Sequence, residues 1–186
     1  MKVSREQTAE NRRNILDAAA ALFRERGFEA VTVAEVMKAA GLTHGGFYGH
    51  FKSKDELIAR TMDHALRNAA TQPTLLDFVR TYLSPAHRDN PALGCAVSAL
   101  GSEAGRQSAE TRAVMTWGLD RQIARLSETA PGMDEDERRR AATGAWAALV
   151  GAMTLARAAD DPALSDRVLA DTLAWLEERL DGGPAA

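Results

Sequence analysis

The sequence predicts an all-α protein, because its composition, its apolar spacing and its helix-start patterns all favour helices. Ala, Leu, Arg and Glu, which have high helix propensity, are abundant, and runs of β-branched residues are few. Apolar residues recur at helical spacing along most of the chain. A Thr, Ser or Asp followed three residues later by Glu, a pattern typical of helix starts, occurs at Thr32, Ser53 and Asp134. At 186 residues the chain is long enough for one compact helical unit or for two small ones that share a core.

The first predicted helix covers residues 9–26 and ends at Gly27. Its apolar positions recur at helical spacing and give it one buried face. They are Ile15, Leu16, Ala19, Leu22 and Phe23. Three arginines near its start, Arg5, Arg12 and Arg13, could contact phosphate, but charges at a helix start are more often simply solvated.

Two short helices follow, separated by a tight turn. Thr32 and Glu35 form a predicted capping box, in which the hydroxyl and the carboxylate each bond a backbone N–H at the helix start. Gly41 ends this helix, Thr43 caps the next one, and Ser53 begins a third. Two short helices joined by a turn that contains Gly are typical of the helix-turn-helix, whose second helix lies in the major groove of DNA.

The second short helix reads T-H-G-G-F-Y-G-H-F, a composition that a purely structural helix would avoid. Each Gly in a helix costs about 1 kcal/mol relative to Ala, so the adjacent Gly45 and Gly46 indicate that a large surface must approach the backbone. Phe47 and Phe51 fall on the core side of the helix. Tyr48 falls on the other side, where phenol, imidazole and ammonium groups could donate to phosphate oxygens.

At these residues the sequence resembles the TetR/AcrR family of one-component transcriptional regulators. The resemblance rests on the string G-L-T-H-G-G-F-Y-G-H-F-K-S-K-D-E-L and on the preceding I-L-D-A-A-A-A-L-F-R-E-R-G-F-E-A-V-T-V-A-E-V, and it covers about residues 10–60. It implies a helix-turn-helix DNA-binding domain in residues 1–53 and an effector-binding and dimerisation domain in residues 54–186. It also implies that the helix after Ser53 transmits the ligand state, and that repression is the commoner mode of action.

The predicted contacts with double-stranded operator DNA lie in or beside the helix-turn-helix. Thr43 and His44 are candidates for base edges, with the backbone of Gly45 close to the groove. The alternatives are a plain helix cap for Thr43 and a solvated surface histidine for His44. Thr32 is predicted to cap its helix, and a phosphate contact by Thr32 is as much expected as its absence. Further phosphate contacts are expected from Tyr48, His50, Lys52 and Lys54.

Six more helices are expected after the helix-turn-helix. They cover residues 54–71, 74–84, 91–106, 108–127, 136–159 and 162–180. The last two have apolar faces wider than the core of one chain needs, so they are predicted to pair across a two-fold axis into a four-helix bundle. The family resemblance implies the same homodimer.

The effector is expected to be a small hydrophobic or electrophilic molecule. The resemblance implies a site between the linking helix and the helices that follow it, and apolar residues there are candidates for its lining. They are Met62, Leu66, Phe78, Tyr82, Cys95, Leu100, Met115, Trp117, Trp146 and Met153. For each of them an ordinary place in the core is the alternative. Cys95 is also a candidate redox sensor, because a helix start favours the thiolate form of a cysteine. The alternative is that Cys95 is a small buried apolar residue.

Charge and motif content favour a DNA-binding protein over an enzyme. Residues 1–60 contain ten Lys and Arg against eight Asp and Glu, whereas residues 61–186 contain thirteen against eighteen, so the positive charge lies with the motif. The four histidines lack metal-ligand spacing and no glycine-rich phosphate loop appears, so no catalytic residue, metal or cofactor is predicted. A helical small-molecule-binding protein or a thiol redox sensor acting through Cys95 is the alternative.

Compartment is predicted from three further features. The chain has one cysteine, which excludes an internal disulfide and fits a reducing compartment. It has no signal-peptide pattern and no apolar run approaching the length of a membrane span. The expectation is a cytoplasmic protein without membrane contact.

Overall fold

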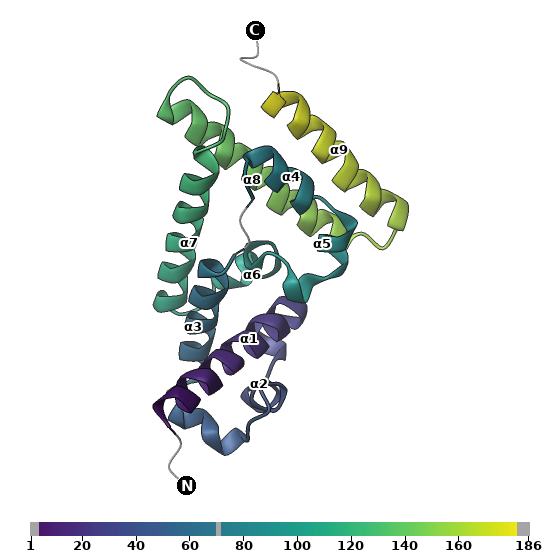
Figure 1. Cartoon of the computed structure of the whole chain (residues 1–186). Helices are drawn as coiled ribbons and strands as arrows, with labels where there is room; N and C mark the ends of the chain where they lie inside the picture. Colours follow the sequence, from purple (N-terminus) through teal and green to yellow (C-terminus); the bar gives the residue numbers. More distant parts are fainter. Residues whose placement is uncertain (1–3, 70–71, 182–186) are drawn as a thin grey trace. The chain divides into compact units, whose positions relative to one another are not determined.

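The computed structural model describes residues 4–69 and 72–181, which form helices joined by turns, with no strand in these ranges (Figure 1). The predicted all-α class is therefore confirmed. The helix-turn-helix lies near the N-terminus, as predicted, and the helices that follow differ from the prediction mainly between residues 84 and 95.

The described residues pack into two compact units. The first unit combines those in Met1–Ala69 with Pro91–Thr116, and the second combines those in Ala70–Asn90 with Trp117–Ala186. This division follows packing, and it differs from the boundary predicted after Ser53, which divides the chain by function. The functional division stays a prediction.

In the first unit, α1 (Arg5–Ala30) begins after Ser4, whose hydroxyl accepts the Gln7 N–H at 3.1 Å. Its helical conformation is interrupted at Gly27, where φ is 80°, and one further turn follows. Gly27 thus ends the regular helix as predicted, whereas the start lies earlier than residue 9. The buried residues of α1 are Ile15, Ala19, Ala20, Phe23 and Phe28.

The next helix, α2 (Val33–Ala39), begins at the predicted capping box. The Glu35 N–H donates to the Thr32 hydroxyl at 3.2 Å, and the Thr32 N–H and hydroxyl donate to the Glu35 carboxylate at 2.8 and 2.7 Å. The Arg26 guanidinium lies 2.9 Å from the same carboxylate. The hydrogen bonds from Thr32, followed by the one from Arg26, lower the pKa of Glu35 from 4.5 to about 2.

Acid is expected to release this helix start. Because the folded pKa of Glu35 lies below its ordinary value, its ionised form stabilises α2 fully above pH 4.5, and this stabilisation is lost as the pH falls from there through about 2. The Thr32 amide proton should lose its hydrogen-bonded NMR shift with a midpoint near pH 2, because this shift follows the folded pKa of Glu35, and Glu35→Gln should abolish the titration. A wild-type Thr32 amide shift that titrates at pH 4.5 would contradict this expectation.

The turn after α2 is a Schellman motif built on Gly41, whose φ is 72°. The Gly41 N–H donates to the Lys38 carbonyl at 3.0 Å, and the Leu42 N–H donates to the Met37 carbonyl at 2.8 Å. A side chain at Gly41 would be strained in this left-handed conformation. Gly41 therefore ends α2 as predicted.

The second helix of the helix-turn-helix is a 3-10 helix, η1 (His44–Gly49). Thr43 has the extended backbone of an N-cap, with φ −81° and ψ 147°, but its side chain makes no capping hydrogen bond. Thr43 therefore occupies the predicted N-cap position, but its hydroxyl does not bond a backbone N–H of the helix. Three glycines give this segment a low helix propensity, which explains why it does not form a regular α-helix.

The linking helix, α3 (Lys54–Arg67), begins after Ser53, whose hydroxyl accepts the Glu56 N–H at 3.1 Å. The Glu56 carboxylate accepts the Lys52 N–H at 2.8 Å, whereas the predicted capping box assigns it to the Ser53 N–H. The backbone N–H that Glu56 accepts is thus one residue earlier than the capping box predicts. The predicted end at residue 71 lies outside the described residues, and α3 ends at Arg67.

The chain re-enters the first unit at Pro91. The single helix predicted over residues 91–106 is divided into η2 (Pro91–Leu93) and α6 (Ala96–Ala104). Cys95, with φ −66° and ψ 123°, has extended backbone and occupies the N-cap position of α6, so the helical path is broken there.

Two longer helices begin as predicted. The hydroxyl of Ser108 caps the first turn of α7 (Ala109–Ser127) at 3.2 Å. Asp134 caps α8 (Glu135–Ala158), its carboxylate accepting the Glu137 N–H at 2.8 Å.

The second unit also contains α4 (Leu75–Tyr82), α5 (Pro85–Asp89) and α9 (Pro162–Asp181). The prediction missed α5, although Ser84 accepts an N–H of its first turn at 3.2 Å and Pro85 occupies a position that favours a helix start. Figure 1 shows α9 running alongside α8, and α4 packs against both.

Candidate nucleic-acid interface

The recognition segment, residues 43–51, is anchored from inside by two phenylalanines. Phe47 and Phe51 are each 1% exposed, and their rings stack with centroids 5.8 Å apart. Met37 of α2 is fully buried, and its Cε lies 3.7 Å from the position that a Cβ would take on Gly46. The prediction that both phenylalanines face the core is confirmed.

The other side of the recognition segment faces solvent. Tyr48 is 74% exposed, and its ring lies edge-on to Phe47 with centroids 5.3 Å apart. Thr43 and His44 are also exposed, as is Lys52 just beyond the segment. These four side chains carry hydroxyl, imidazole, phenol and ammonium donors, the groups that bond base edges and phosphate oxygens. Their contacts with DNA stay predictions.

Two glycines of the recognition segment have no role inside the protein that requires glycine. Neither Gly45 nor Gly49 has a positive φ. A Cβ added to either would meet no atom of the described chain within 4 Å. Backbone strain and internal packing therefore do not explain these glycines. They leave the backbone open to the close approach of a surface from outside.

Arg12 of α1 holds the C-terminal end of the recognition segment. Its guanidinium donates to the His50 carbonyl and lies over the Phe51 ring, 4.2 Å from the centroid. Arg12 therefore acts within the protein, a role that its position in the sequence does not indicate.

His50 is partly buried beside this arginine. Burial, and secondarily the charge of Arg12, lower the pKa of the imidazole. At neutral pH the ring is therefore uncharged, and a phosphate contact, which stays a prediction, would use a neutral N–H donor.

Two other candidates for phosphate contacts have partners within the protein. The Lys54 ammonium donates to the Glu29 carbonyl at 3.4 Å, and Lys54 is half-buried. The Thr32 hydroxyl accepts the Glu35 N–H, which confirms its capping role, and it donates to the Glu35 carboxylate. Phosphate contacts by Lys54 and Thr32 stay predictions, and each would add to or replace an existing hydrogen bond.

The residues predicted to line an effector site are divided between the two units. In the first unit Met62, Leu100 and Met115 are buried, while Leu66 and Cys95 are half-buried. In the second unit Tyr82, Trp146 and Met153 are buried, while Phe78 and Trp117 are half-buried. Within the described residues, the indole N–H of Trp146 is buried without a hydrogen-bond acceptor. The effector role of all ten stays a prediction.

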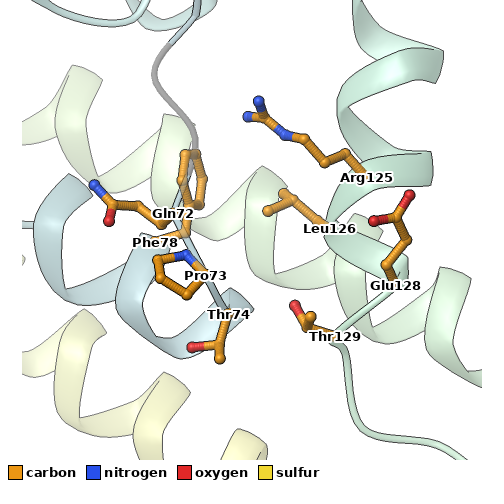
Figure 2. A pocket seen from close by; sticks show the side chains of 8 residues that line it. All are labelled: Gln72, Pro73, Thr74, Phe78, Arg125, Leu126, Glu128 and Thr129. Atoms are coloured by element: carbon orange, nitrogen blue, oxygen red, sulfur yellow. The ribbon is translucent and has the colours of Figure 1, made fainter.

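A small hollow opens in the second unit between the start of α4 and the end of α7 (Figure 2). Its volume is about 50 Å³, whereas sites for drug-sized ligands have roughly 300–1,000 Å³. It is lined by Gln72, Pro73, Thr74, Phe78, Arg125, Leu126, Glu128 and Thr129. Of the predicted lining residues, only Phe78 contributes.

Cys95 lies at the start of α6 and is half-buried. The guanidinium of Arg24 is close enough to interact with it electrostatically, and the Arg24 Nε donates to the Ala92 carbonyl at 2.7 Å. Its redox role stays a prediction. Within the described residues, no three His, Cys, Asp or Glu side chains are grouped as a metal site, and none of the helices is both long and apolar enough to cross a membrane.

These observations define a helix-turn-helix protein of the DNA-binding class. A capped helix, a Schellman turn and an outward-facing second helix follow one another, and the second helix is fixed by buried aromatic rings. The second helix is the element that such proteins place in the major groove.

Residues 15–61 match the family described as bacterial regulatory proteins, tetR family. The chain is 39% identical over 56 residues to the HTH-type transcriptional regulator AcrR of Shigella flexneri, which covers 30% of this chain and 26% of that protein. It is 34% identical over 86 residues to the HTH-type transcriptional repressor Rv1474c of Mycobacterium tuberculosis, which covers 45% of this chain and 46% of that protein. The chain thus aligns with less than half the length of either relative.

Solved structures extend the likeness in fold to nearly the whole chain. NemR of E. coli in its reduced form superposes with a TM-score of 0.72 at 22% identity, covering 95% of this chain and all of that one. The TetR regulator TylP of Streptomyces fradiae gives a TM-score of 0.62 at 25% identity, covering 95% of this chain and 80% of that one. The matched family model and the names of these relatives indicate a TetR/AcrR family transcriptional regulator, a DNA-binding protein rather than an enzyme, as the sequence predicts.

Proposed function

We propose that the chain is a ligand-responsive repressor that binds a palindromic operator as a homodimer and is released by a small effector. The observation that carries this proposal is the outward face of the recognition segment. Gly45 and Gly49 leave its backbone open to an approaching surface, and Thr43, His44 and Tyr48 place polar groups beside them. A major groove fits such a face, because base edges and phosphates are then within reach of both backbone and side chains.

Dimerisation through α8 and α9 is supported by what these helices expose. Leu155 is 62% exposed, and Leu164 and Trp175 are each 45% exposed. Gly144 and Gly151 on α8 are exposed as well, and a Cβ on either would meet no described atom within 4 Å. Large apolar side chains beside open small ones suit the close approach of a second copy. Two recognition segments related by a dyad would read half-sites about 34–36 Å apart.

The proposed effector is apolar with at least one hydrogen-bond acceptor. Trp146 and Met153 are buried apolar residues suited to an aromatic or irregular ligand. The buried indole N–H of Trp146, for which the described residues supply no acceptor, would donate to the ligand. An electrophilic effector would instead react with Cys95, and release that survives Cys95→Ser would exclude that route.

The proposal is tested by selecting DNA with the purified protein. Random duplexes retained by the protein should converge on a palindrome, and the protein should bind that sequence far more tightly than unrelated DNA at the same salt concentration. Retained duplexes without a common sequence would refute the proposal.

Two substitutions separate base reading from phosphate binding. His44→Ala should relax the sequence preference at one position of each half-site, because His44 is a candidate for a base edge. Lys52→Ala should weaken binding to all sequences and reduce the salt slope by about 1 for each subunit, because Lys52 is exposed and a candidate for phosphate. The reverse pattern in binding titrations would refute both assignments.

A further inference from the structure

The corner between α1 and α2 is held by a carboxylate from a distant part of the chain. Glu103 of α6 accepts the Phe28 N–H at 2.8 Å, across 75 residues of sequence. Phe28 is 1% exposed and packs edge-on against Phe23 with ring centroids 5.3 Å apart. Because Gly27 interrupts the regular helix just before Phe28, an acceptor from outside α1 is well placed here.

Gly27 is fitted to the same carboxylate. A Cβ at this position would lie 2.6 Å from one carboxylate oxygen of Glu103 and 3.1 Å from the other. The φ of 80° would also strain any residue with a side chain. The glycine therefore allows both the turn of the chain and the approach of Glu103.

The corner in turn sets the position of the recognition segment. Val31 is fully buried, and the next residue, Thr32, caps α2, which packs against η1. On the other side of the recognition segment, the Lys54 ammonium donates to the Glu29 carbonyl at 3.4 Å. The helices on either side of the recognition segment thus each contact residues 29–32, α2 through its cap at Thr32 and α3 through Lys54.

A second contact attaches the same part of the chain to α1. The Arg24 Nε donates to the Ala92 carbonyl in η2 at 2.7 Å. Arg24 and Phe28 are one helical turn apart in sequence, so residues 92–103 contact the end of α1 at two neighbouring points. A movement of α6 relative to α1 must strain or break the bond between Glu103 and the Phe28 N–H.

We propose that Glu103 is a positioning residue that couples α6 to DNA binding. With its carboxylate on the Phe28 N–H, the corner holds the recognition segment in the orientation that binds the operator. A shift of α6 that withdraws the carboxylate frees the corner and weakens the complex. This inference rests on the proposed function and adds the residue through which the effector response reaches the recognition segment.

The test measures DNA affinity of the full-length protein by fluorescence anisotropy, on a selected operator and on an unrelated duplex. Glu103→Ala should bind the operator about tenfold more weakly, because a charge-assisted hydrogen bond is lost, and the unrelated duplex within about twofold of wild type. Glu103→Gln, which keeps an acceptor, should recover part of the loss. Glu110→Ala removes an exposed carboxylate of the same unit, paired with Arg60 at 3.4 Å, and should leave both affinities within about twofold.

Two results would overturn the inference while the proposed function stands. One is a Glu103→Ala protein whose operator affinity stays within twofold of wild type or rises. The other is an equal loss of affinity for operator and unrelated DNA, which would indicate general unfolding. A wild-type protein that binds no DNA sequence selectively would refute the proposed function, and this inference with it.

A double-mutant cycle with hydrogen exchange checks the contact itself. Gly27→Ala should weaken operator binding more in the wild-type background than in Glu103→Ala, because the added Cβ displaces a carboxylate only where one is present. Amide exchange at Phe28 should be about tenfold faster in Glu103→Ala, while exchange within α2 changes little. Strictly additive effects, or an unchanged Phe28 exchange rate, would overturn the inference.

Discussion

A Gly45→Leu protein is expected to keep its fold and lose operator binding by at least about a hundredfold. Nothing in the described chain lies within 4 Å of a Cβ at this position, and its φ is not positive, so a side chain fits without internal clash. The same side chain would project from the exposed face of η1 and keep a duplex away from the backbone. Thermal unfolding should show a melting temperature within a few degrees of wild type, while anisotropy titrations show the loss.

The matched control is Gly105→Leu. Gly105 follows α6 in the same unit, is exposed, and would also accept a Cβ without meeting a described atom within 4 Å. Its substitution should leave both stability and operator affinity near wild type. Equal affinity of the Gly45→Leu and Gly105→Leu proteins for the operator would show that the open face at Gly45 is not the DNA-binding surface.

An Arg12→Ala protein is expected to lose both stability and DNA binding. The substitution removes a charge-assisted hydrogen bond to the His50 carbonyl and a stacked cation over Phe51. Such contacts at a partly buried site contribute about 2–3 kcal/mol to the free energy of unfolding. Operator affinity should fall with them, because the C-terminal end of the recognition segment loses its anchor. Urea unfolding and operator titration measure the two effects.

Arg13→Ala is the control for Arg12→Ala. Arg13 is the exposed neighbour on α1, and its removal deletes the same charge without the same contacts. It should unfold like wild type and should weaken DNA binding only to the extent that a positive charge near DNA matters. Arg12→Lys should recover little, because an ammonium does not stack on an aromatic ring as a guanidinium does. An Arg12→Ala protein as stable as Arg13→Ala would refute the anchoring role.

Local patterns were sufficient to predict most helix starts and stops. The capping box at Thr32, the turn at Gly41 and the interruption at Gly27 all depend on residues within a few positions of one another. Backbone capping has short-range geometry, so such signals can be interpreted without knowledge of the tertiary structure. The same holds for Phe47 and Phe51, whose spacing alone places both in the core.

Contacts between distant segments could not be predicted in this way. Arg12 meets the His50 carbonyl across 38 residues, and Glu103 meets the Phe28 N–H across 75. A backbone carbonyl or N–H carries no side-chain identity, so nothing in the amino-acid pattern marks it as the partner of a particular arginine or glutamate. Lys54 is a further example: a lysine beside a DNA-binding motif predicts a phosphate contact, which stays a prediction, and nothing in the pattern indicates that its ammonium donates to the Glu29 carbonyl.

Candidate effector residues present a different difficulty. Met62, Leu100 and Met153 are buried, as either a core or a ligand site would require. Core residues and ligand-lining residues show the same apolar pattern at helical spacing, because the removal of apolar surface from water favours the burial of both. The indole N–H of Trp146, for which the described residues supply no acceptor, is the kind of feature that distinguishes them, and only the structure reveals it.

Hydroxyl-radical footprinting of the selected operator, combined with the mass of the complex, shows whether two chains bind one symmetric site. We expect two protected tracts related by a dyad, with centres about 34–36 Å apart along the duplex, and a complex that contains two chains. Protection should disappear with Gly45→Leu and persist with Gly105→Leu. A single asymmetric tract bound by one chain, or protection that survives Gly45→Leu, would refute DNA binding by paired recognition segments.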